Sequence, residues 1–282
     1  QLMRFLPFVA FLYGTMAGSF ANVCIWRMPR EESVVTPRSR CPGCGAPIVW
    51  YDNIPLVSYL ILGGACRNCR GRISWRYPLV EALTGFLWAA VTWRLVALGM
   101  HWTVVLVHVA LMTALVIITF IDIDHRIIPN EITYAGMILA PALSFLLPGL
   151  HSFGGEATRA GALVQSLLGM AAGGGSIWAL GAVGSWVFRK EAMGFGDVKL
   201  MAMLGGLLGW KLVLVVFFVA PCFGSVVGIV HRIVTGDRYI PYGPFLALAA
   251  AIAVLFPVEL LHGVDRYLEV FGFMGRALVG RG

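Results

Sequence analysis

Long runs of apolar residues are the feature that most restricts what this chain can fold into. A helix needs about 20 mostly apolar residues to cross the hydrocarbon core of a bilayer. The sequence therefore predicts an all-α polytopic membrane protein with about eight transmembrane helices. The sixth is expected to be short, because Lys211 separates it from the seventh. The eight predicted spans are residues 5–26, 79–99, 102–121, 132–149, 163–187, 198–210, 212–231 and 243–262.

Composition agrees with this class. Hydrophobic residues make up 59% of the chain and charged residues 12%, with a mean hydropathy of +0.83. A soluble domain has roughly twice this charged fraction. The formal net charge of +7 is interpreted by where the charges lie and not as a sign of nucleic-acid binding. The expected partner is therefore the lipid bilayer, and no nucleic acid is expected.

The segment at 27–78 between the first two spans is polar and basic. It contains 8 arginines against 3 acidic residues. Since lysine and arginine collect in short cytoplasmic loops, we expect this insert to be cytoplasmic and the amino terminus to lie on the other side. Arginines follow the first span, whereas a cleaved signal peptide has its basic residues before the apolar stretch, so we interpret this segment as a transmembrane helix. We thus divide the chain into a first transmembrane helix (1–26), the insert (27–78), a helical bundle (79–262) and a tail (263–282), which we interpret as an interfacial helix.

Four cysteines in the insert form two CxxC pairs, "CPGC" and "CRNC". Two such pairs about 20 residues apart are typical of a tetrahedral zinc site. With four thiolate ligands no position remains for a catalytic water, so the expected zinc is structural. The alternative is two disulfides or unpaired thiols, which a reducing cytoplasm disfavours. Cys24 and Cys222 lie within apolar spans and are interpreted as core residues. The predicted ligands are Cys41, Cys44, Cys66 and Cys69.

Carboxylates next to apolar spans are costly and indicate function. Asp122 and Asp124 follow the third span in "FIDIDHRIIPN", and Asp197 precedes the sixth in "GFGDVKL". Two spans lie between these motifs, so both motifs are expected at the cytoplasmic face. Two converging carboxylates favour aspartic proteolysis, in which one is ionised and the other protonated.

Other interpretations of these acids stay open. Asp122 or Asp124 could be solvated at a helix end, and Asp197 could cap the sixth helix. A transporter would use Asp122 and Asp197 as a proton relay, although transport sites collect near the bilayer midplane. We expect Gly194 and Gly196 to permit close backbone approach and unusual dihedral angles. Lys199 is interpreted as an interfacial anchor whose charge reaches water.

Nearly the whole chain resembles the type IV prepilin peptidases, the bacterial leader peptidase/N-methyltransferases. The resemblance rests on "GSFANVCIWRMPR", "CPGCGAPIVWYDNIPLVSYLILGGACRNCRGRIS", "RYPLVEALTG", "DIDHRIIPN", "GFGDVKL" and "YGPFLALA". The GxGD element alone is weak evidence, because other intramembrane aspartyl proteases share it. Combined with the paired CxxC insert and the upstream aspartate–Ile-Pro-Asn element, it is specific.

The resemblance implies two reactions in the inner bacterial membrane. The enzyme would remove the basic leader of type IV prepilins and type II secretion pseudopilins after a glycine. It would then methylate the new amino terminus with S-adenosylmethionine. The family pattern places the catalytic pair on Asp122 and Asp197, with Asp124 in support. It also associates the four-cysteine insert with methyl transfer and zinc.

Cofactor and substrate contacts are less determined. The chain has no GxGxxG loop after a predicted strand, and "AAGGG" at 171–175 lies in the fifth span, where it favours close helix packing. Asp52 and Glu81 are candidates for holding the basic leader, the substrate amine or the cofactor. Structural roles for them are at least as well supported. Two rival functions remain, a peptidase with a purely structural insert and a non-enzymatic transporter or scaffold.

Overall fold

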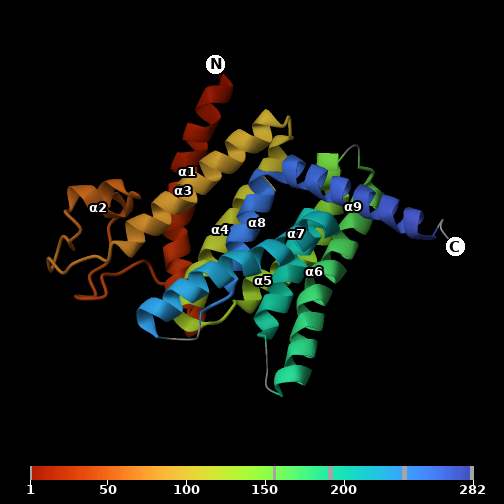
Figure 1. The fold of residues 1–282 in the computed structure, drawn as a ribbon. Helices are drawn as coiled ribbons and strands as arrows, with labels where there is room; N and C mark the ends of the chain where they lie inside the picture. The colour runs from red at the N-terminus through yellow and green to blue at the C-terminus, as the bar shows by residue number, and fades with distance from the viewer. Residues whose placement is uncertain (1, 155–156, 190–192, 237–239, 280–282) are drawn as a thin grey trace. The chain divides into compact units, whose positions relative to one another are not determined.

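The computed structural model describes residues 2–154, 157–189, 193–236 and 240–279. The chain divides into two compact units, Gln1–Pro129 and Asn130–Gly282. Each unit is described by itself below. Both are built from helices, as predicted (Figure 1).

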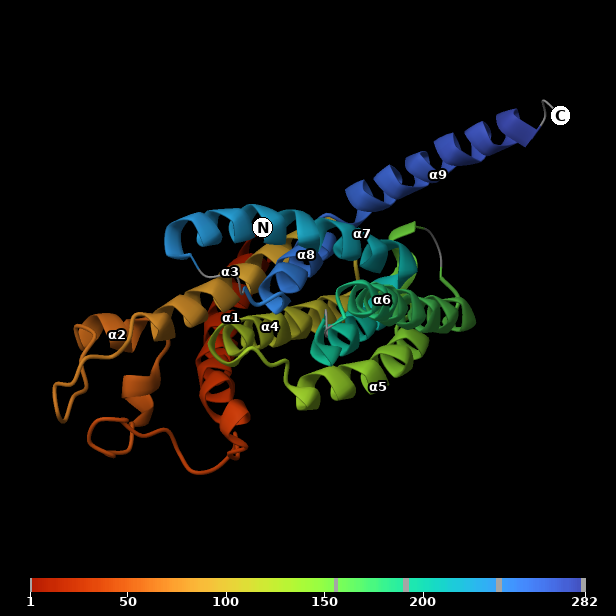
Figure 2. The same cartoon turned by 60° about the horizontal axis from the view of Figure 1, so that its bottom comes forward.

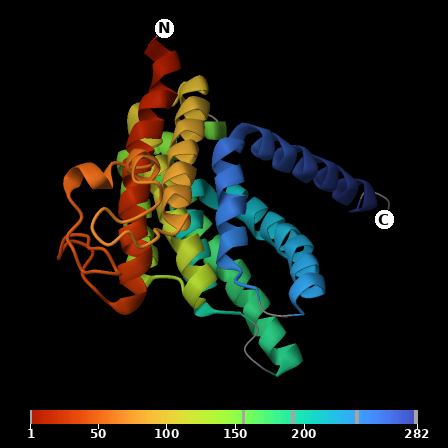
Figure 3. The same cartoon turned by 90° about the vertical axis from the view of Figure 1, so that its left-hand side faces the viewer.

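Three long helices form the first unit: α1 (Leu2–Arg27), α3 (Arg76–Ala97) and α4 (Trp102–His125). α1 and α3 pack against each other, crossing in the view of Figure 1 and running side by side in that of Figure 3. Their apolar side chains and those of α4 make the core, where Val80, Val91, Met112 and Ile121 are fully buried. α4 is apolar on nearly all sides, which is expected of a helix surrounded by protein and lipid.

Small residues bring α1 and α3 into backbone contact. A Cβ atom added to Gly18 would lie 2.7 Å from the Cα atom of Glu81, and one added to Gly85 would lie 2.8 Å from the Thr15 methyl group. Such distances leave no room for a side chain. Close approach through small residues is how helices associate in lipid, where the hydrophobic effect does not drive them together. The alignment of these two helices places Glu81 against Gly18 of α1.

The polar insert between α1 and α3 contains little regular structure. It consists of the 3-10 helices η1 (Met28–Arg30) and η2 (Trp50–Asn53), the short helix α2 (Val57–Ile61) and loops. Two isolated antiparallel bridges, Arg40 with Pro47 and Ala65 with Arg72, each close a tight loop. A segment of this size with few buried side chains needs a further source of stability.

The second unit contains α5 (Asn130–Leu146), η3 (Pro148–Gly154), α6 (Arg159–Phe188), α7 (Phe195–Thr235), α8 (Gly243–Leu255) and α9 (Pro257–Val279). α6 lies against α7, and α5 lies beside both (Figure 2). The first half of α7 is the centre of this unit, with Leu200, Met201 and Leu204 fully buried.

Glycines again determine the closest helix crossing. A Cβ atom at Gly169 of α6 would lie 2.0 Å from the backbone oxygen of Gly205 in α7, and one at Gly173 would lie 2.2 Å from that of Met201. The prediction that "AAGGG" permits close packing is therefore confirmed at Gly173. It does not hold for Gly175, which has open space around its Cα.

α7 is interrupted once. Gly209 has φ 81° and ψ 168°, a backbone region that is open essentially only to glycine. The predicted sixth and seventh spans, 198–210 and 212–231, are therefore two helical segments joined at this residue. The division was expected at Lys211 because of its charge. Its cause is the conformation of Gly209.

Each of the eight predicted spans overlaps a helix, although the span 132–149 runs past the end of α5 at Leu146. Within the described residues, five helices are long and apolar enough to cross a membrane: α1, α3, α4, α6 and α7. α5 is shorter, at 17 residues. The predicted span 243–262 is not one helix, because α8 ends at Leu255 and α9 leaves it at 94° (Figure 3). Pro257 supplies no backbone donor and moves Phe256 out of the helical region, to φ −125° and ψ 47°. If the pair counts as one broken span, the total is six.

Candidate active site and metal centre

The four predicted metal ligands are brought together. The Sγ atoms of Cys41, Cys44, Cys66 and Cys69 all lie within 4.8 Å of one another. The Sγ atoms of Cys41 and Cys69 are 3.8 Å apart. A tetrahedral site with zinc–sulfur bonds of about 2.3 Å has sulfur–sulfur edges of about 3.8 Å. All four cysteines are free thiols, so the disulfide alternative does not describe this structure. The donor set fits a structural zinc ion.

The two CxxC loops have the same backbone pattern. The Cys41 N–H donates to the Ala46 carbonyl at 2.9 Å, and the Cys66 N–H donates to the Gly71 carbonyl at 2.9 Å. In each loop the residue four places after the first cysteine has a left-handed conformation, Gly45 at φ 70° and Arg70 at φ 58°. Both loops thus turn their thiols toward a common centre. Arg70 is not a glycine, and this conformation costs such a residue roughly 1 kcal/mol.

Hydrogen bonds within the cluster favour ionised sulfur at Cys44 and Cys66. The Asn68 side-chain amide donates to Cys44 Sγ at 3.6 Å, and this bond, together with one from the Ala46 backbone, lowers the pKa of the Cys44 thiol to about 6. Backbone N–H groups of Cys69 and Asn68 lower the pKa of Cys66. The Gly71 backbone lowers the pKa of the Cys69 thiol, but hydrogen bonds with the other three cysteines raise it to about 11. Four thiolates at this separation repel one another, so full ionisation needs a cation among them.

The two candidate substrate or cofactor acids have structural partners. Asp52 binds Arg67 through two oxygens, at 2.6 Å and 2.8 Å, and this ion pair lowers the pKa of the Asp52 carboxyl. Glu81 Oε2 accepts the Leu56 N–H at 2.8 Å. Leu56 has φ 60°, so Glu81 holds a strained residue at the start of α2. These contacts are those that a structural role predicts.

Asp122 and Asp124 lie in the last turn of α4. Asp122 is buried, with 6% of its surface exposed, and its carbonyl accepts the N–H of Arg126 at 2.9 Å. Arg126 ends the helix in the left-handed conformation, at φ 57°. Asp124 is partly exposed and binds Arg76 of α3 at 2.7 Å.

Asp197 lies in the first turn of α7, in the second unit. Gly194 is the residue before the helix, so Asp197 is the third helical residue and not the N-cap. A Cβ atom at Gly194 would lie 3.6 Å from Asp197 Oδ2, so the carboxylate is directed back toward the helix start. The expected unusual dihedral angles are wrong: Gly194 has φ −71° and ψ 139°, and neither Gly194 nor Gly196 has a positive φ. The predicted close backbone approach stays a prediction.

Lys199 connects two of the sequence motifs. Its ammonium group donates a hydrogen bond to the side-chain oxygen of Asn130, the first residue of α5. The same group lies 5.0 Å from the ring centre of Tyr134 and 5.5 Å from that of Phe195. Lys199 is half-buried. The ammonium group therefore contacts Asn130 and two aromatic rings, and the interpretation of Lys199 as an interfacial anchor stays a prediction.

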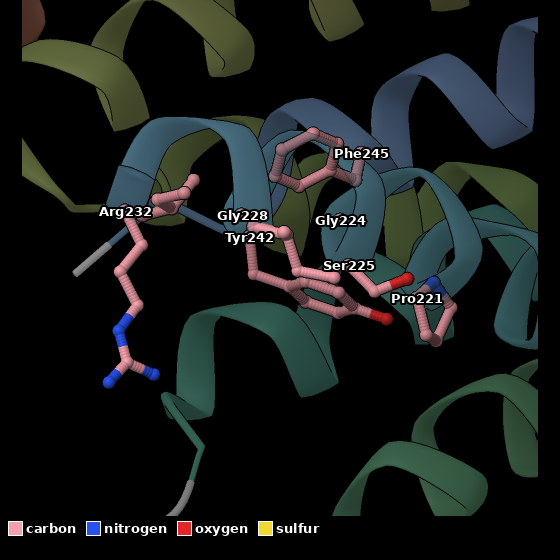
Figure 4. Close-up of a pocket in the computed structure, with 9 residues that line it drawn as sticks. Pro221, Gly224, Ser225, Gly228, Arg232, Tyr242 and Phe245 are labelled. Atoms are coloured by element: carbon pink, nitrogen blue, oxygen red, sulfur yellow. The ribbon is translucent and has the colours of Figure 1, made fainter. Parts of the chain in front are cut away.

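Tyr242 brings a third element to the neighbourhood of Asp197. Burial, and then the negative charge of Asp197, raise the pKa of Tyr242 to about 12. Tyr242 precedes α8 and lines a groove of about 530 Å³ with residues of the second half of α7. Figure 4 shows the Tyr242 ring across this groove with its hydroxyl near Pro221 and Ser225, while the Arg232 side chain points away.

Comparison with known proteins assigns the chain to a family. Residues 12–95 match the Bacterial Peptidase A24 N-terminal domain, and residues 109–229 match the Type IV leader peptidase family. A prepilin leader peptidase/N-methyltransferase of Aeromonas hydrophila is 36% identical over 91% of this chain and 94% of its own length. The chain belongs to the type IV leader peptidase family. The predicted resemblance is thereby confirmed, and family membership identifies the chain as an enzyme.

Other relatives agree with this assignment. The Pseudomonas aeruginosa protein of the same name is 33% identical over 93% of this chain and 93% of its own length. The Myxococcus xanthus protein of that name is 44% identical over 80% of this chain, and the match spans 63% of the relative. No solved structure is significantly similar to the chain.

The family matches place the site residues in two domains. The four cysteines and Glu81 fall in the peptidase A24 N-terminal domain, and Asp122 and Asp197 fall in the leader peptidase domain. Sequence reasoning missed three residues that interact with the candidate site residues: Arg76 binds Asp124, Asn130 accepts a hydrogen bond from Lys199, and Tyr242 lies near Asp197. Each stands in a motif that carried the resemblance, "RYPLVEALTG", "DIDHRIIPN" or "YGPFLALA". These motifs were the sequence signal that could have pointed to the three residues, but only the structure shows which residues each of them contacts.

Proposed function

We propose that this protein removes the basic leader of type IV prepilins and pseudopilins after a glycine, and then methylates the new amino terminus. The family assignment is the observation that carries the proposal. The matches to two prepilin leader peptidase/N-methyltransferases cover nearly the whole length of those relatives. The two predicted catalytic acids lie inside the region that matches the leader peptidase family.

The helix ends on which the two acids stand favour a division of roles. Asp197 is in the first turn of α7, where the positive end of the helix dipole stabilises a negative charge. Asp122 is buried in the last turn of α4, where the negative end of the dipole and burial disfavour a charge. We assign Asp197 as the ionised base and Asp122 as the protonated acid. This division applies when substrate binding brings both carboxyl groups to the scissile bond.

The chemistry follows from these roles. Asp197 takes a proton from water as the water oxygen attacks the scissile carbonyl carbon, and Asp122 gives its proton to the carbonyl oxygen. Collapse of the tetrahedral species breaks the C–N bond. The departing amine takes a proton from Asp197, and the hydroxyl proton returns to Asp122, so both acids regain their starting states.

Zinc has a structural role in this proposal. Cys41, Cys44, Cys66 and Cys69 would hold it, and all four ligand positions would be filled by thiolate. Binding would supply folding free energy to an insert with few buried side chains. The cysteine insert would thereby acquire a fixed shape against α1 and α3.

The second reaction transfers a methyl group from S-adenosylmethionine to the primary amine that cleavage releases; the S–CH3 bond breaks to leave S-adenosylhomocysteine, and the nitrogen loses a proton. The name that the relatives share, prepilin leader peptidase/N-methyltransferase, supports this reaction. Of the two candidate acids, Glu81 is the better contact for a basic group, because the partners that the structure gives it are neutral, the Leu56 N–H and Ser19. Asp52 is already neutralised by Arg67.

We place the protein in the inner membrane of a bacterium, with the insert and both acids at the cytoplasmic face. The apolar helices of the structure support a multi-pass membrane protein. The basic composition of the insert supports its cytoplasmic side.

Intact-mass analysis of a purified prepilin tests this function. The prepilin is incubated with the protein in detergent, with and without S-adenosylmethionine. We expect loss of the leader in both samples and an added methyl mass only with S-adenosylmethionine. Cleavage without methylation would leave a peptidase with a structural insert, and an intact prepilin in both samples would contradict the proposal.

A further inference from the structure

Arg76 connects the end of the insert with the helix end that carries Asp122. It is the first residue of α3 and follows the second cysteine loop closely in the chain. Its Nη1 atom lies 2.7 Å from Asp124 Oδ2, and its Nη2 atom donates to the Phe120 carbonyl at 3.2 Å. Its guanidinium carbon lies 4.9 Å from the centre of the Phe120 ring. One side chain thus makes three contacts with the last two turns of α4.

The contacts lie on one face of α4. Phe120 and Asp124 are four residues apart, so they are neighbours along the helix surface, and Asp122 lies between them in the chain on another face. A guanidinium group bound to both residues restricts translation and rotation of this helix end. A cation near the carboxyl end of a helix is also favourable, because it opposes the negative end of the helix dipole.

The position of Arg76 is itself determined by the insert. The Ile73 N–H donates to the Gly64 carbonyl at 2.7 Å, and the bridge between Ala65 and Arg72 closes the second cysteine loop. Only Ser74 and Trp75 then separate this hydrogen-bonded loop from Arg76. A displacement of the second cysteine loop would therefore move Arg76, and through Arg76 the end of α4.

We propose that Arg76 is a positioning residue for peptide cleavage, which fixes Asp122 by holding Phe120 and Asp124 and makes its position depend on the fold of the cysteine insert. This inference rests on the proposed function. It assigns no contact between Arg76 and substrate. It predicts that the insert, which contains neither acid of the predicted pair, affects peptide cleavage.

Cleavage kinetics of four variants test the proposal. Arg76→Gln is expected to lower kcat on the order of 10- to 100-fold with KM within about twofold of wild type, because small misplacements of a reacting group have effects of this size. Arg76→Lys keeps the charge but cannot contact Asp124 and the Phe120 carbonyl together, so its kcat should lie between those of Arg76→Gln and wild type. The double variant Arg76→Asp with Asp124→Arg restores an ion pair and should recover at least tenfold of the rate lost by Arg76→Asp alone.

The matched control is Arg38→Gln, which removes one exposed arginine of the insert outside the second cysteine loop. Its kcat should equal that of wild type. Equal losses in Arg38→Gln and Arg76→Gln, or no recovery in the exchanged pair, would overturn the proposal. An inactive wild type would instead contradict the proposed function, so the two failures are distinguishable.

Hydrogen exchange supplies a readout that does not depend on activity. Amide exchange at residues 118–126 should become faster in wild type after zinc chelation, and equally fast in Arg76→Gln before chelation. Chelation should then add little in Arg76→Gln. If chelation leaves exchange at the end of α4 unchanged in wild type, the insert does not act on Asp122 through this contact.

Discussion

The Lys199 ammonium group donates a hydrogen bond to the side-chain oxygen of Asn130. Asn130 belongs to the motif that begins with Asp122, and Lys199 belongs to the motif that contains Asp197. Within the second unit this bond joins the start of α5 to the first turns of α7. Two separate stretches of sequence therefore meet at one contact, close to one of the proposed catalytic acids.

Replacing Lys199 tests the strength of that contact. We expect Lys199→Met and Asn130→Ala each to lower thermal stability in detergent, since a hydrogen bond to a charged group contributes about 1.5–3 kcal/mol when shielded and less when partly exposed. The double variant should lose less stability than the sum of the two single losses, with a coupling free energy of about 1 kcal/mol. Lys211→Met, with Asn130→Ala, is the control pair, because Lys211 binds Asp265 elsewhere. Additive losses for Lys199 and Asn130 would contradict the coupling.

The crossing of α6 and α7 predicts a strong dependence on two glycines. A Cβ atom at Gly205 would lie 1.9 Å from the backbone oxygen of Gly169. Gly205→Ala must therefore separate the helices, and we expect a loss of about 2–4 kcal/mol, comparable to severe overpacking. Gly175→Ala is the matched control in α6, since nothing lies within 4 Å of its added Cβ. It should be neutral or stabilising by up to about 1 kcal/mol. Equal effects of the two variants on thermal unfolding would show that the crossing is looser than described.

The cysteine cluster predicts about one zinc ion per chain. Elemental analysis of purified protein should find it, and Cys41→Ser or Cys69→Ser should abolish stoichiometric binding, because each removes one of four ligands. Cys222→Ser is the control, since this cysteine lies in α7 outside the cluster. A wild-type protein without bound metal, or a Cys222→Ser protein that loses it, would refute the zinc assignment.

The two cysteine loops offer an internal test of backbone strain. Arg70 has the left-handed conformation that Gly45 has in the other loop. Arg70→Gly should therefore stabilise the folded insert by about 0.5–1 kcal/mol, after allowance for the greater freedom of glycine in the unfolded chain. Gly45→Arg should destabilise it by a similar amount. Amide exchange of residues 40–72 under zinc-buffered conditions measures both changes, and a faster exchange in Arg70→Gly would argue against strain at Arg70.

Local patterns predicted much of this structure. The zinc ligands followed from CxxC spacing, because each pair makes its own loop and the ligand type determines the metal. The helices followed from apolar runs. The break before α9 was also readable, since Pro257 lies inside the predicted last span and proline ends helices. A break was expected near Lys211 because of its charge, but it occurs at Gly209. The glycine itself gave no warning, because a glycine inside an apolar run is usually tolerated in a helix.

Contacts between distant residues could not be predicted in this way. The bond of Arg76 to Asp124 depends on how α3 and α4 pack, and the bond of Lys199 to Asn130 depends on α5 and α7. Apolar periodicity identifies helices but does not choose their neighbours. The dihedral angles of Gly194 were predicted incorrectly, because its residue type permits unusual angles without requiring them.

The central claim is that Asp122 and Asp197 together cut the prepilin leader. Its most direct test is the cleavage rate of a purified prepilin in detergent by wild type, Asp122→Asn and Asp197→Asn, with Asp265→Asn as the control carboxylate. We predict a loss on the order of 1,000-fold or more for each of the first two variants, with unchanged thermal stability, and a wild-type rate for the control. The cleavage rate of Asp124→Asn should lie between that of the two catalytic variants and that of the control, because this change only weakens the contact of Arg76 with the end of α4. Cleavage at the wild-type rate by a folded Asp122→Asn or Asp197→Asn protein would contradict the account.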